Sequence, residues 1–285
     1  MKSINNKIII SGINGFLGKA LSVDLRFAGY EVWGIDIFSN DDKYVSSADL
    51  LDYKAVERVA SKFQSSITLI HAAALAHNQK PPDGETVITT NIIITKNILK
   101  AFNNKIEHII FFSSVSVYGE DKRYVPVRVD DDLRPSTKYG TSKLICEKII
   151  LNSNINNCDI LRFAPVFDRG HMHDVSKRVF FPGSSSIKIM IKPSPSYSLT
   201  KIETAVKNVR KLLSNKMGGK NIINVCDEIP YNQNELSNRF KGKIINVHVI
   251  ILKPFYWLTY LLPKYYGYKL RCYFWKLFYS NIYTA

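Results

Sequence analysis

The sequence predicts an α/β fold in which a doubly wound parallel sheet precedes a smaller C-terminal lobe. Three observations support this prediction: short apolar runs alternate with segments of helical periodicity, polar residues follow the runs, and the alternation stops near residue 168. Strands of a parallel sheet are buried on both faces by the connecting helices, so they show as continuous apolar runs. We expect a first domain at 1–168 and a second, interleaved lobe at 169–285.

The expected strands and helices follow one another in regular alternation. The 285 residues are 46% hydrophobic and 22% charged, which is enough apolar chain for a sizeable core. Alternation of this kind builds right-handed crossovers, and ligands bind at the carboxyl ends of the strands. Strands are expected at 7–11, 30–36, 67–73, 106–114 and 158–167, and helices at 16–29, 55–63, 89–102 and 137–151.

Beyond residue 168 the alternation gives way to a different pattern. The stretch 169–198 is rich in Ser, Pro and basic residues and is expected to be irregular. A helix at 201–213, a strand at 221–227 and a helix around 232–240 are expected to follow. These elements predict the smaller lobe.

The charge of the chain is strongly positive. The formal net charge is +15, and no acidic residue follows Glu235. A nucleic acid, a phosphorylated small substrate or an anionic membrane surface would each match this charge. We expect no nucleic-acid partner, because the sequence shows no zinc-finger, RNA-recognition or helix-turn-helix signature.

The cysteines favour a reduced, cytoplasmic protein without a metal site. Cys146, Cys158, Cys226 and Cys272 form no CxxC pair and show no regular spacing. The N-terminal stretch MKSINNKIIISGING lacks the long apolar region of a signal peptide.

Glycines mark the junction between the first strand and the first helix. The stretch SGINGFLG places Gly12, Gly15 and Gly18 there. A Rossmann-type turn needs glycine for a tight bend, for close approach of the backbone to a pyrophosphate and for packing of the helix on the strand, and the helix N-terminus attracts the anion. Ordinary turn glycines are the alternative interpretation.

Asp36 indicates which dinucleotide is bound. It ends the second expected strand, 18 residues after Gly18, where a carboxylate can accept hydrogen bonds from both ribose hydroxyls of NAD. The following stretch IFSNDDK holds two further acids and no Arg, so it would repel the 2′-phosphate of NADP. NAD is therefore the expected cofactor; a solvated acid at a strand end is the alternative.

Ser114, Tyr139 and Lys143 form the candidate catalytic group. Tyr139 lies 25 residues after Ser114 and four residues before Lys143. Residues four apart share a helix face, and a nearby ammonium lowers the pKa of a phenol from its ordinary value of about 10. We expect Tyr139 to act as general acid and base, with Ser114 holding the same oxygen and Lys143 also holding the nicotinamide ribose. A solvated helix-surface pair is the alternative.

Several motifs in order carry a family resemblance. After SGINGFLG and Asp36, the chain shows ADLLD (48–52), IHAAALAH (70–77), SSVSVYG (113–119), YGTSK (139–143) and LRFAPV (161–166). This series resembles the extended short-chain dehydrogenases/reductases, and specifically the NAD-dependent epimerase/dehydratase family that acts on nucleotide sugars. The resemblance is strong over 5–170 and loose over 171–240, and it implies a homodimer.

The resemblance implies roles for further residues. Asn91 would be structural, and His71 and His77 would shape the turn and the pocket rim rather than transfer protons. Ser114, Ser116, Tyr139 and Pro165 are the substrate-binding candidates. The candidates for binding the cofactor are Gly12, Asn14, Gly15, Phe16, Leu17, Gly18, Asp36, Asp49, Leu50, Ala72, Ala73, Ala74, Tyr139 and Lys143.

The chain also departs from the family pattern. Dehydratases usually carry an Asp-Glu pair where this chain has Val115 and Ser116, so dehydration is disfavoured. Pro165 stands at the position of a substrate-contacting Asn, and Pro195 at that of a diphosphate-binding Arg. The basic residues that are candidates for contacting the diphosphate instead, or that are simply solvated, are Lys177, Arg178, Lys188 and Lys192.

The C-terminal segment 249–278 is apolar and aromatic with interspersed cations. Lys253, Pro254 and Pro263 interrupt it, so no run reaches the roughly 18 apolar residues of a membrane span. We expect helices of the substrate lobe that pack on the core; binding along an anionic bilayer is the less favoured alternative. In related enzymes a further segment follows this stretch, so the lobe is either truncated or naturally short.

The function expected from these motifs is 4-epimerisation of a nucleotide-diphosphate sugar for surface polysaccharide synthesis. Tyr139 would remove the proton from the sugar 4-hydroxyl as hydride passes to NAD. The 4-keto sugar would then rotate in the site and take the hydride back on its other face. A reductase of 4-keto sugar nucleotides is the alternative favoured by Pro165. A non-catalytic dinucleotide-binding protein ranks below both.

Overall fold

Seven of the described strands form one sheet, which is the centre of the fold. The computed structural model describes residues 7–38, 42–64, 66–76, 80–119, 126–215 and 218–284. The spatial order β11-β6-β5-β4-β1-β2-β3 reverses between β1 and β4, and the pairs from β3 to β6 are parallel. The strands are β1 (Lys7–Ser11), β2 (Glu31–Asp36), β3 (Val45–Ser47), β4 (Ile67–His71), β5 (Ile106–Ser114), β6 (Asn157–Phe163) and β11 (Lys220–Val225).

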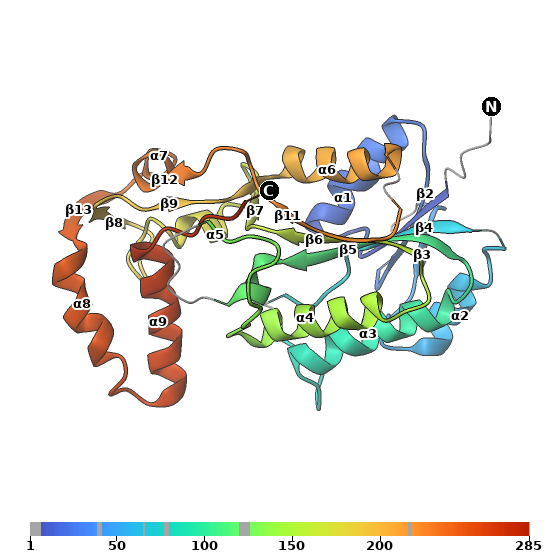
Figure 1. Cartoon of the computed structure of the whole chain (residues 1–285), viewed down its shortest axis with the longest axis horizontal. Helices are drawn as coiled ribbons and strands as arrows, with labels where there is room; N and C mark the ends of the chain where they lie inside the picture. The colour runs from blue at the N-terminus through green and yellow to red at the C-terminus, as the bar shows by residue number, and fades with distance from the viewer. Residues whose placement is uncertain are drawn as a thin grey trace. The chain divides into compact units, whose positions relative to one another are not determined.

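Helices cover both faces of this sheet (Figure 1). One face carries α1 (Phe16–Phe27) and α6 (Ile202–Ser214), and the other carries α2 (Tyr53–Ala60), α3 (Val87–Ala101) and α4 (Lys138–Leu151). The apolar residues of the first predicted strand are buried, with Ile8, Ile9 and Ile10 at 1% exposure or less. The predicted doubly wound α/β class is confirmed.

Local sequence signals set the ends of the helices. Thr86 and Thr89 form a reciprocal capping box at the start of α3, and the Thr137 hydroxyl accepts a hydrogen bond from the Gly140 N–H at the start of α4. Gly29, with a φ of +86°, follows α1 in the left-handed region, where glycine is favoured.

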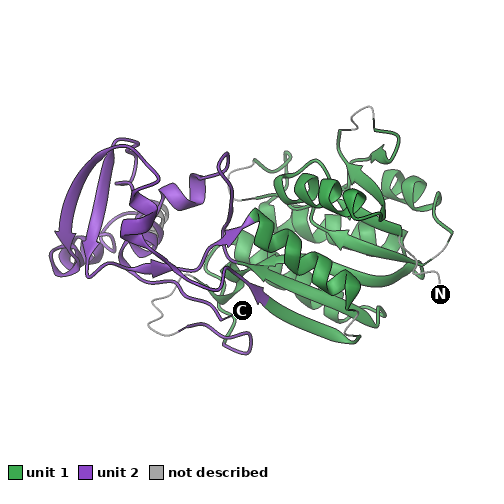
Figure 2. Cartoon of the chain, turned by 90° about the horizontal axis from the view of Figure 1, so that it is seen from above, with its two compact units in different colours: residues 1–119, 132–163, 202–223 green, residues 120–131, 164–201, 224–285 purple. Residues whose placement is uncertain are grey.

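The chain divides into two compact units (Figure 2). Unit 1 comprises residues 1–119, 132–163 and 202–223 and contains most of the sheet. Unit 2 comprises residues 120–131, 164–201 and 224–285. Its elements are β7 (Val166–Phe167), β8 (Ile187–Lys192), β9 (Ser196–Tyr197), β10 (Thr200–Lys201), β12 (Tyr231–Asn232), β13 (Lys243–His248), α5 (His173–Ser176), α7 (Gln233–Ser237), α8 (Val249–Leu258) and α9 (Lys264–Phe278).

Two details of the predicted elements were wrong. The expected strand at 158–167 is broken after Phe163 into β6 and β7, because Pro165 offers no N–H to continue a ladder. The expected irregular stretch at 169–198 contains β8, which pairs in parallel with β13 along its whole length.

Unit 2 has its own apolar clusters. One gathers Phe167, Val179, Tyr197 and Leu236, and another joins Ile189 and Ile191 to the end of α9. The Lys188 ammonium is buried and donates hydrogen bonds to the carbonyls of Ser237 and Phe240, at 3.2 and 3.0 Å. Arg178 is likewise buried, with its guanidinium against the Asp174 carbonyl. These two candidates for contacting a diphosphate are engaged within the protein.

None of the described helices combines the length and the apolar composition needed to cross a bilayer.

Candidate active site

The glycine turn between β1 and α1 is built on close backbone contacts. Gly12 has a φ of +75°, and a Cβ atom there would lie 2.8 Å from the backbone of Ala73. A Cβ on Gly18 would overlap the carbonyl oxygen of Gly12. The turn therefore admits no larger residue at these two positions without movement of the backbone.

The N-terminus of α1 faces this turn. Gly15 is the N-cap residue, and among the described residues no side chain caps the helix there. The first N–H groups of a helix carry a partial positive charge and bind phosphate well. Because Gly15 is exposed and has no side chain, a phosphate can approach these groups closely.

Asp36 is held against the glycine turn. Its Oδ2 accepts a hydrogen bond from the Asn14 N–H at 2.9 Å, and its Oδ1 accepts one from the Ile37 N–H at 2.8 Å. The carboxylate stays partly exposed, and each oxygen keeps capacity for a further hydrogen bond. The Asn14 side-chain amide donates to the carbonyl of Phe38 at 2.7 Å. The arrangement fits a ribose with two hydroxyl donors.

The remaining predicted cofactor residues lie on loops next to this turn. The Ala48 N–H donates to the Asp36 carbonyl at 2.8 Å, which places Asp49 and Leu50, just after β3, beside the end of β2. The Ala72 N–H donates to the Ser11 carbonyl at 3.1 Å, which brings the alanines after β4 beside the end of β1. Asp49 is exposed, whereas Leu50 is buried.

Ser114 and Ser116 are joined at the end of β5. Ser114 ends the strand, a short 3-10 helix η1 (Val115–Tyr118) follows, and the two hydroxyls lie 2.5 Å apart. α4 packs against η1 through Gly140, where a Cβ atom would lie 2.5 Å from the Ser116 carbonyl oxygen. The glycine next to Tyr139 thus lets the tyrosine's helix approach the serines.

Lys143 lies one turn after Tyr139 and is 3% exposed. Its ammonium donates a hydrogen bond to the Phe112 carbonyl at 2.7 Å and lies 5.7 Å from the centre of the Tyr139 ring. Burial lowers the pKa of Lys143 from 10.5 to about 8, although the nearby Cys146 and Glu147 oppose the shift. Lys143 therefore remains positively charged near the Tyr139 ring at neutral pH.

A buried ion pair that the sequence did not predict joins α4 to β5 and β6. The Glu147 carboxylate accepts hydrogen bonds from the Ser113 hydroxyl at 2.5 Å and from the Arg162 guanidinium at 2.8 and 3.1 Å. Arg162 also donates to the Tyr118 hydroxyl at 2.9 Å. Glu147 follows Lys143 by four residues, so a charged stripe along the helix was the available signal. This cluster holds α4 to β5, β6 and η1.

His71 is fully buried rather than at a pocket rim. Its ring nitrogens lie 2.8 Å from the Ser11 hydroxyl and 3.0 Å from the Thr95 hydroxyl. Burial, helped by the charge of Lys143, lowers its pKa to about 3, so the ring is neutral at physiological pH. His77 lies outside the described residues. Asn91 bridges the backbone of Leu75 to the Ser142 hydroxyl.

Pro165 lies in unit 2, and the other predicted site residues lie in unit 1. The Pro165 carbonyl accepts a hydrogen bond from the Thr200 N–H at 3.0 Å. Among the described residues, the glycine turn lies beside Asp36 and beside the alanines that follow β4. Ser114 and Ser116 form a second group with α4.

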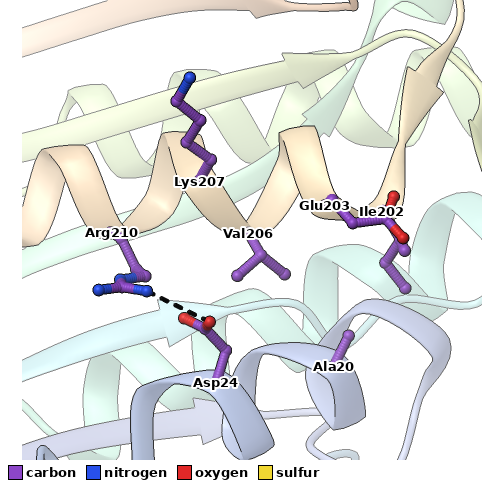
Figure 3. A pocket seen from close by; sticks show the side chains of 7 residues that line it. All are labelled: Ala20, Asp24, Ile202, Glu203, Val206, Lys207 and Arg210. Atoms are coloured by element: carbon purple, nitrogen blue, oxygen red, sulfur yellow. Dashed lines mark hydrogen bonds and ion pairs between the residues drawn. The ribbon is translucent and has the colours of Figure 1, made fainter. Parts of the chain in front are cut away.

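A pocket of about 400 Å³ lies between α1 and α6 (Figure 3). Asp24 and Arg210 form an ion pair across it at 3.4 Å, and the Lys207 side chain points away from Asp24. None of the predicted site residues lines this pocket, whose residues are Ala20, Asp24, Ile202, Glu203, Val206, Lys207 and Arg210.

Residues 8–182 match the model of the NAD dependent epimerase/dehydratase family. The chain belongs to this family. The predicted family and its cofactor, NAD, are thereby confirmed. The glycine turn, the start of α1 and the carboxylate of Asp36 fit that cofactor, because they offer N–H groups to its phosphates and an acceptor to a ribose.

Two relatives of the chain are named as 4-epimerases. The chain is 23% identical over 245 residues to the N-acetyl-α-D-glucosaminyl-diphospho-ditrans,octacis-undecaprenol 4-epimerase of Escherichia coli O157:H7, covering 82% of this chain and 71% of that protein. It is 27% identical over 184 residues to the UDP-glucose 4-epimerase of Dictyostelium discoideum, covering 57% of this chain and 53% of that protein. The chain thus spans about half the length of the latter.

Solved structures share the fold. A short-chain dehydrogenase/reductase superfamily protein from Agrobacterium tumefaciens with bound NAD superposes with a TM-score of 0.71 at 19% identity, covering 85% of this chain and 86% of that one. The UDP-glucose 4-epimerase of Thermus thermophilus in complex with NAD superposes with a TM-score of 0.65 at 19% identity, with the same two coverages.

Proposed function

We propose that this chain is an NAD-dependent 4-epimerase of a nucleotide-diphosphate sugar that serves surface polysaccharide synthesis. The observation that carries the proposal is the placement of Tyr139 and Lys143 on α4, packed through Gly140 against the segment that holds Ser114. Dehydration is not supported, because Val115 and Ser116 offer no carboxyl group for the elimination.

In this proposal, residues of the chain remove the proton of the sugar 4-hydroxyl and return it. Bound NAD would accept a hydride from the sugar and return it. Tyr139 takes the hydroxyl proton and later gives it back, which is general base and acid catalysis at one oxygen. The nearby positive charge of Lys143 favours the phenolate form of Tyr139. The Ser114 hydroxyl, which is hydrogen-bonded to that of Ser116, donates a hydrogen bond to the same sugar oxygen.

A reductase of 4-keto sugar nucleotides is the second candidate. It would use the same three residues in a single reduction, and Pro165 favours it because proline lacks the side-chain amide with which the family's Asn contacts the substrate. The dTDP-4-dehydrorhamnose reductase of Mycolicibacterium smegmatis is 26% identical over 197 residues, covering 67% of this chain and 57% of that protein.

A substrate panel separates these functions. The purified protein is incubated with UDP-, GDP- and dTDP-sugars and with a polyprenyl-diphosphate sugar, while sugar isomers and NADH absorbance are followed. An epimerase forms an isomer without net change in NADH, whereas a reductase consumes NADH in proportion to product. Tight NAD binding without reaction on any substrate would reject both functions in favour of a dinucleotide-binding protein.

A further inference from the structure

The helix α8 and the turn after it present apolar side chains to the surface. No residue of α8 is buried. Trp257 is 67% exposed and Leu261 is 82% exposed. We call the following set the α8 face: Ile250, Ile251, Phe255, Trp257, Leu258 and Leu261, each more than half exposed.

α8 is attached to unit 2 along one stripe only. Val249, Leu252 and Tyr256, spaced by three and four residues, are its half-buried positions. Val249 and Leu252 pack on the cluster that contains Ile189 and the end of α9. A surface helix usually turns polar residues outward, whereas the outward arc of α8 is as apolar as its inner stripe. An apolar face of this kind indicates a binding surface.

The charged residues of the segment that contains the α8 face are all basic. The segment 249–278 contains five Lys and Arg residues and no Asp or Glu. Lys253 is exposed within α8 itself. Arg271 of α9 donates to the Thr259 carbonyl at 3.1 Å and stacks on the Tyr260 ring at 4.3 Å, so it holds α9 to the turn that carries Leu261. Figure 1 shows α8 and α9 side by side.

Aromatic rings lie at the C-terminal end of α8 and in the turn after it. Tyr256, Trp257 and Tyr260 pack edge-on or tilted against one another with ring centres 5.7–6.1 Å apart. Trp and Tyr prefer the boundary between hydrocarbon and water, and neighbouring cations bind anionic lipid headgroups. A ten-residue helix is about 15 Å long, about half of the hydrocarbon thickness of a bilayer, so it can lie along a bilayer but cannot cross it.

We propose that the α8 face binds the surface of an anionic lipid bilayer. Exposed apolar and aromatic side chains with cations and no acid match the composition of helices that lie in a membrane interface. A protein partner would need an apolar surface of its own with acidic groups around it, and no feature of the chain points to one. This proposal does not depend on which sugar reaction the protein catalyses.

Vesicle flotation tests the proposal on the full chain. The protein is mixed with vesicles of phosphatidylcholine alone or with added phosphatidylglycerol, at low and at high salt. We expect flotation with the anionic vesicles that weakens as salt rises, because screening reduces the attraction of the cations. Combining Trp257→Glu with Leu261→Glu should lower the affinity by about tenfold or more. Lys253→Glu, which leaves the apolar side chains in place, should lower it by about fivefold or more.

Phe27→Glu is the matched control, because Phe27 is 93% exposed on α1 of unit 1 and does not belong to the α8 face. It should float like the unmodified protein, and NAD binding should be unchanged in every variant. Absence of flotation with anionic vesicles at low salt would overturn the proposal, as would flotation unaffected by Lys253→Glu and by the double variant. A dimer that the double variant converts to monomer, without vesicle binding, would assign the face to a second copy of the chain instead.

Discussion

Helices α4 and α8 both depart from the rule that polar side chains are exposed and apolar side chains are buried. Helix α4 buries polar side chains, whereas α8 exposes apolar ones. On α4, Ser142, Lys143 and Glu147 are polar or charged and at most 3% exposed. On α8, only Lys253 is charged, yet no residue is buried. Both reversals are unfavourable in water unless other contacts compensate for them.

The two helices differ in how the reversal is compensated. Each buried charge of α4 has a partner inside unit 1: the Phe112 carbonyl for Lys143, and Ser113 with Arg162 for Glu147. The apolar side chains of the α8 face are exposed in the chain by itself. Compensation within the fold is typical of a preorganised site, whereas an exposed apolar face is typical of a surface that meets a partner. Substitutions on the two helices should therefore have very different effects.

The largest effect is expected for Tyr139→Phe, which removes only the hydroxyl. Turnover of the sugar substrate should fall by about 100- to 10,000-fold, because the proposed general acid and base is lost. The affinity for NAD, measured by fluorescence titration, should change little. Tyr44→Phe, at an exposed position in the same unit, serves as the control and should keep full activity. Substantial turnover by Tyr139→Phe would show that another group moves the proton.

The next effect is expected for Glu147→Ala, which leaves the Arg162 guanidinium buried without its counter-charge. The free energy of unfolding should fall by about 3–5 kcal/mol in urea titrations. Glu203→Ala, at an exposed position of α6, should change it by only about 0.5 kcal/mol. Replacing Glu147 and Arg162 together by Met should recover part of the loss, since no unpaired charge remains. Equal losses in the single and double variants would contradict this account.

The sequence predicted the parts of the candidate site that depend on local chain geometry. Gly12, Gly18 and Asp36 could be found because a dinucleotide-binding turn needs them at short, fixed spacing. Tyr139 and Lys143 could be found because i and i+4 share a helix face.

Features that depend on distant parts of the chain were not predicted. The pairing of β8 with β13 joins segments more than fifty residues apart. The Glu147–Arg162 pair depends on how α4 lies on β6, and the exposure of α8 is invisible in a sequence whose apolar residues resemble those of a core helix. Each requires the tertiary packing, which local patterns do not determine.

Lys143 should have a smaller effect on the free energy of unfolding, and this effect should depend on pH. Its pKa is about 8 in the folded protein and 10.5 as the ordinary value. The burial penalty is fully present below pH 8 and is relieved as pH rises toward 10.5, where the unfolded chain also loses the proton. The unmodified protein should therefore gain about 3 kcal/mol of unfolding free energy relative to Lys143→Met over this interval, with nucleotide removed. A difference that stays constant with pH would place the lysine pKa near its ordinary value.

The smallest effect is expected on α8. Trp257→Ser removes a large side chain that is 67% exposed, so little apolar contact within the chain is lost. Its unfolding free energy in urea, without lipid, should stay within about 0.5 kcal/mol of the unmodified protein. Tyr197→Ser is the matched contrast: Tyr197 is fully buried in unit 2 and its hydroxyl donates to the Leu277 carbonyl at 2.9 Å, so this change should cost about 3–5 kcal/mol. A comparably large loss from Trp257→Ser would mean that this tryptophan is buried in solution, and α8 would then resemble α4 in contributing to stability.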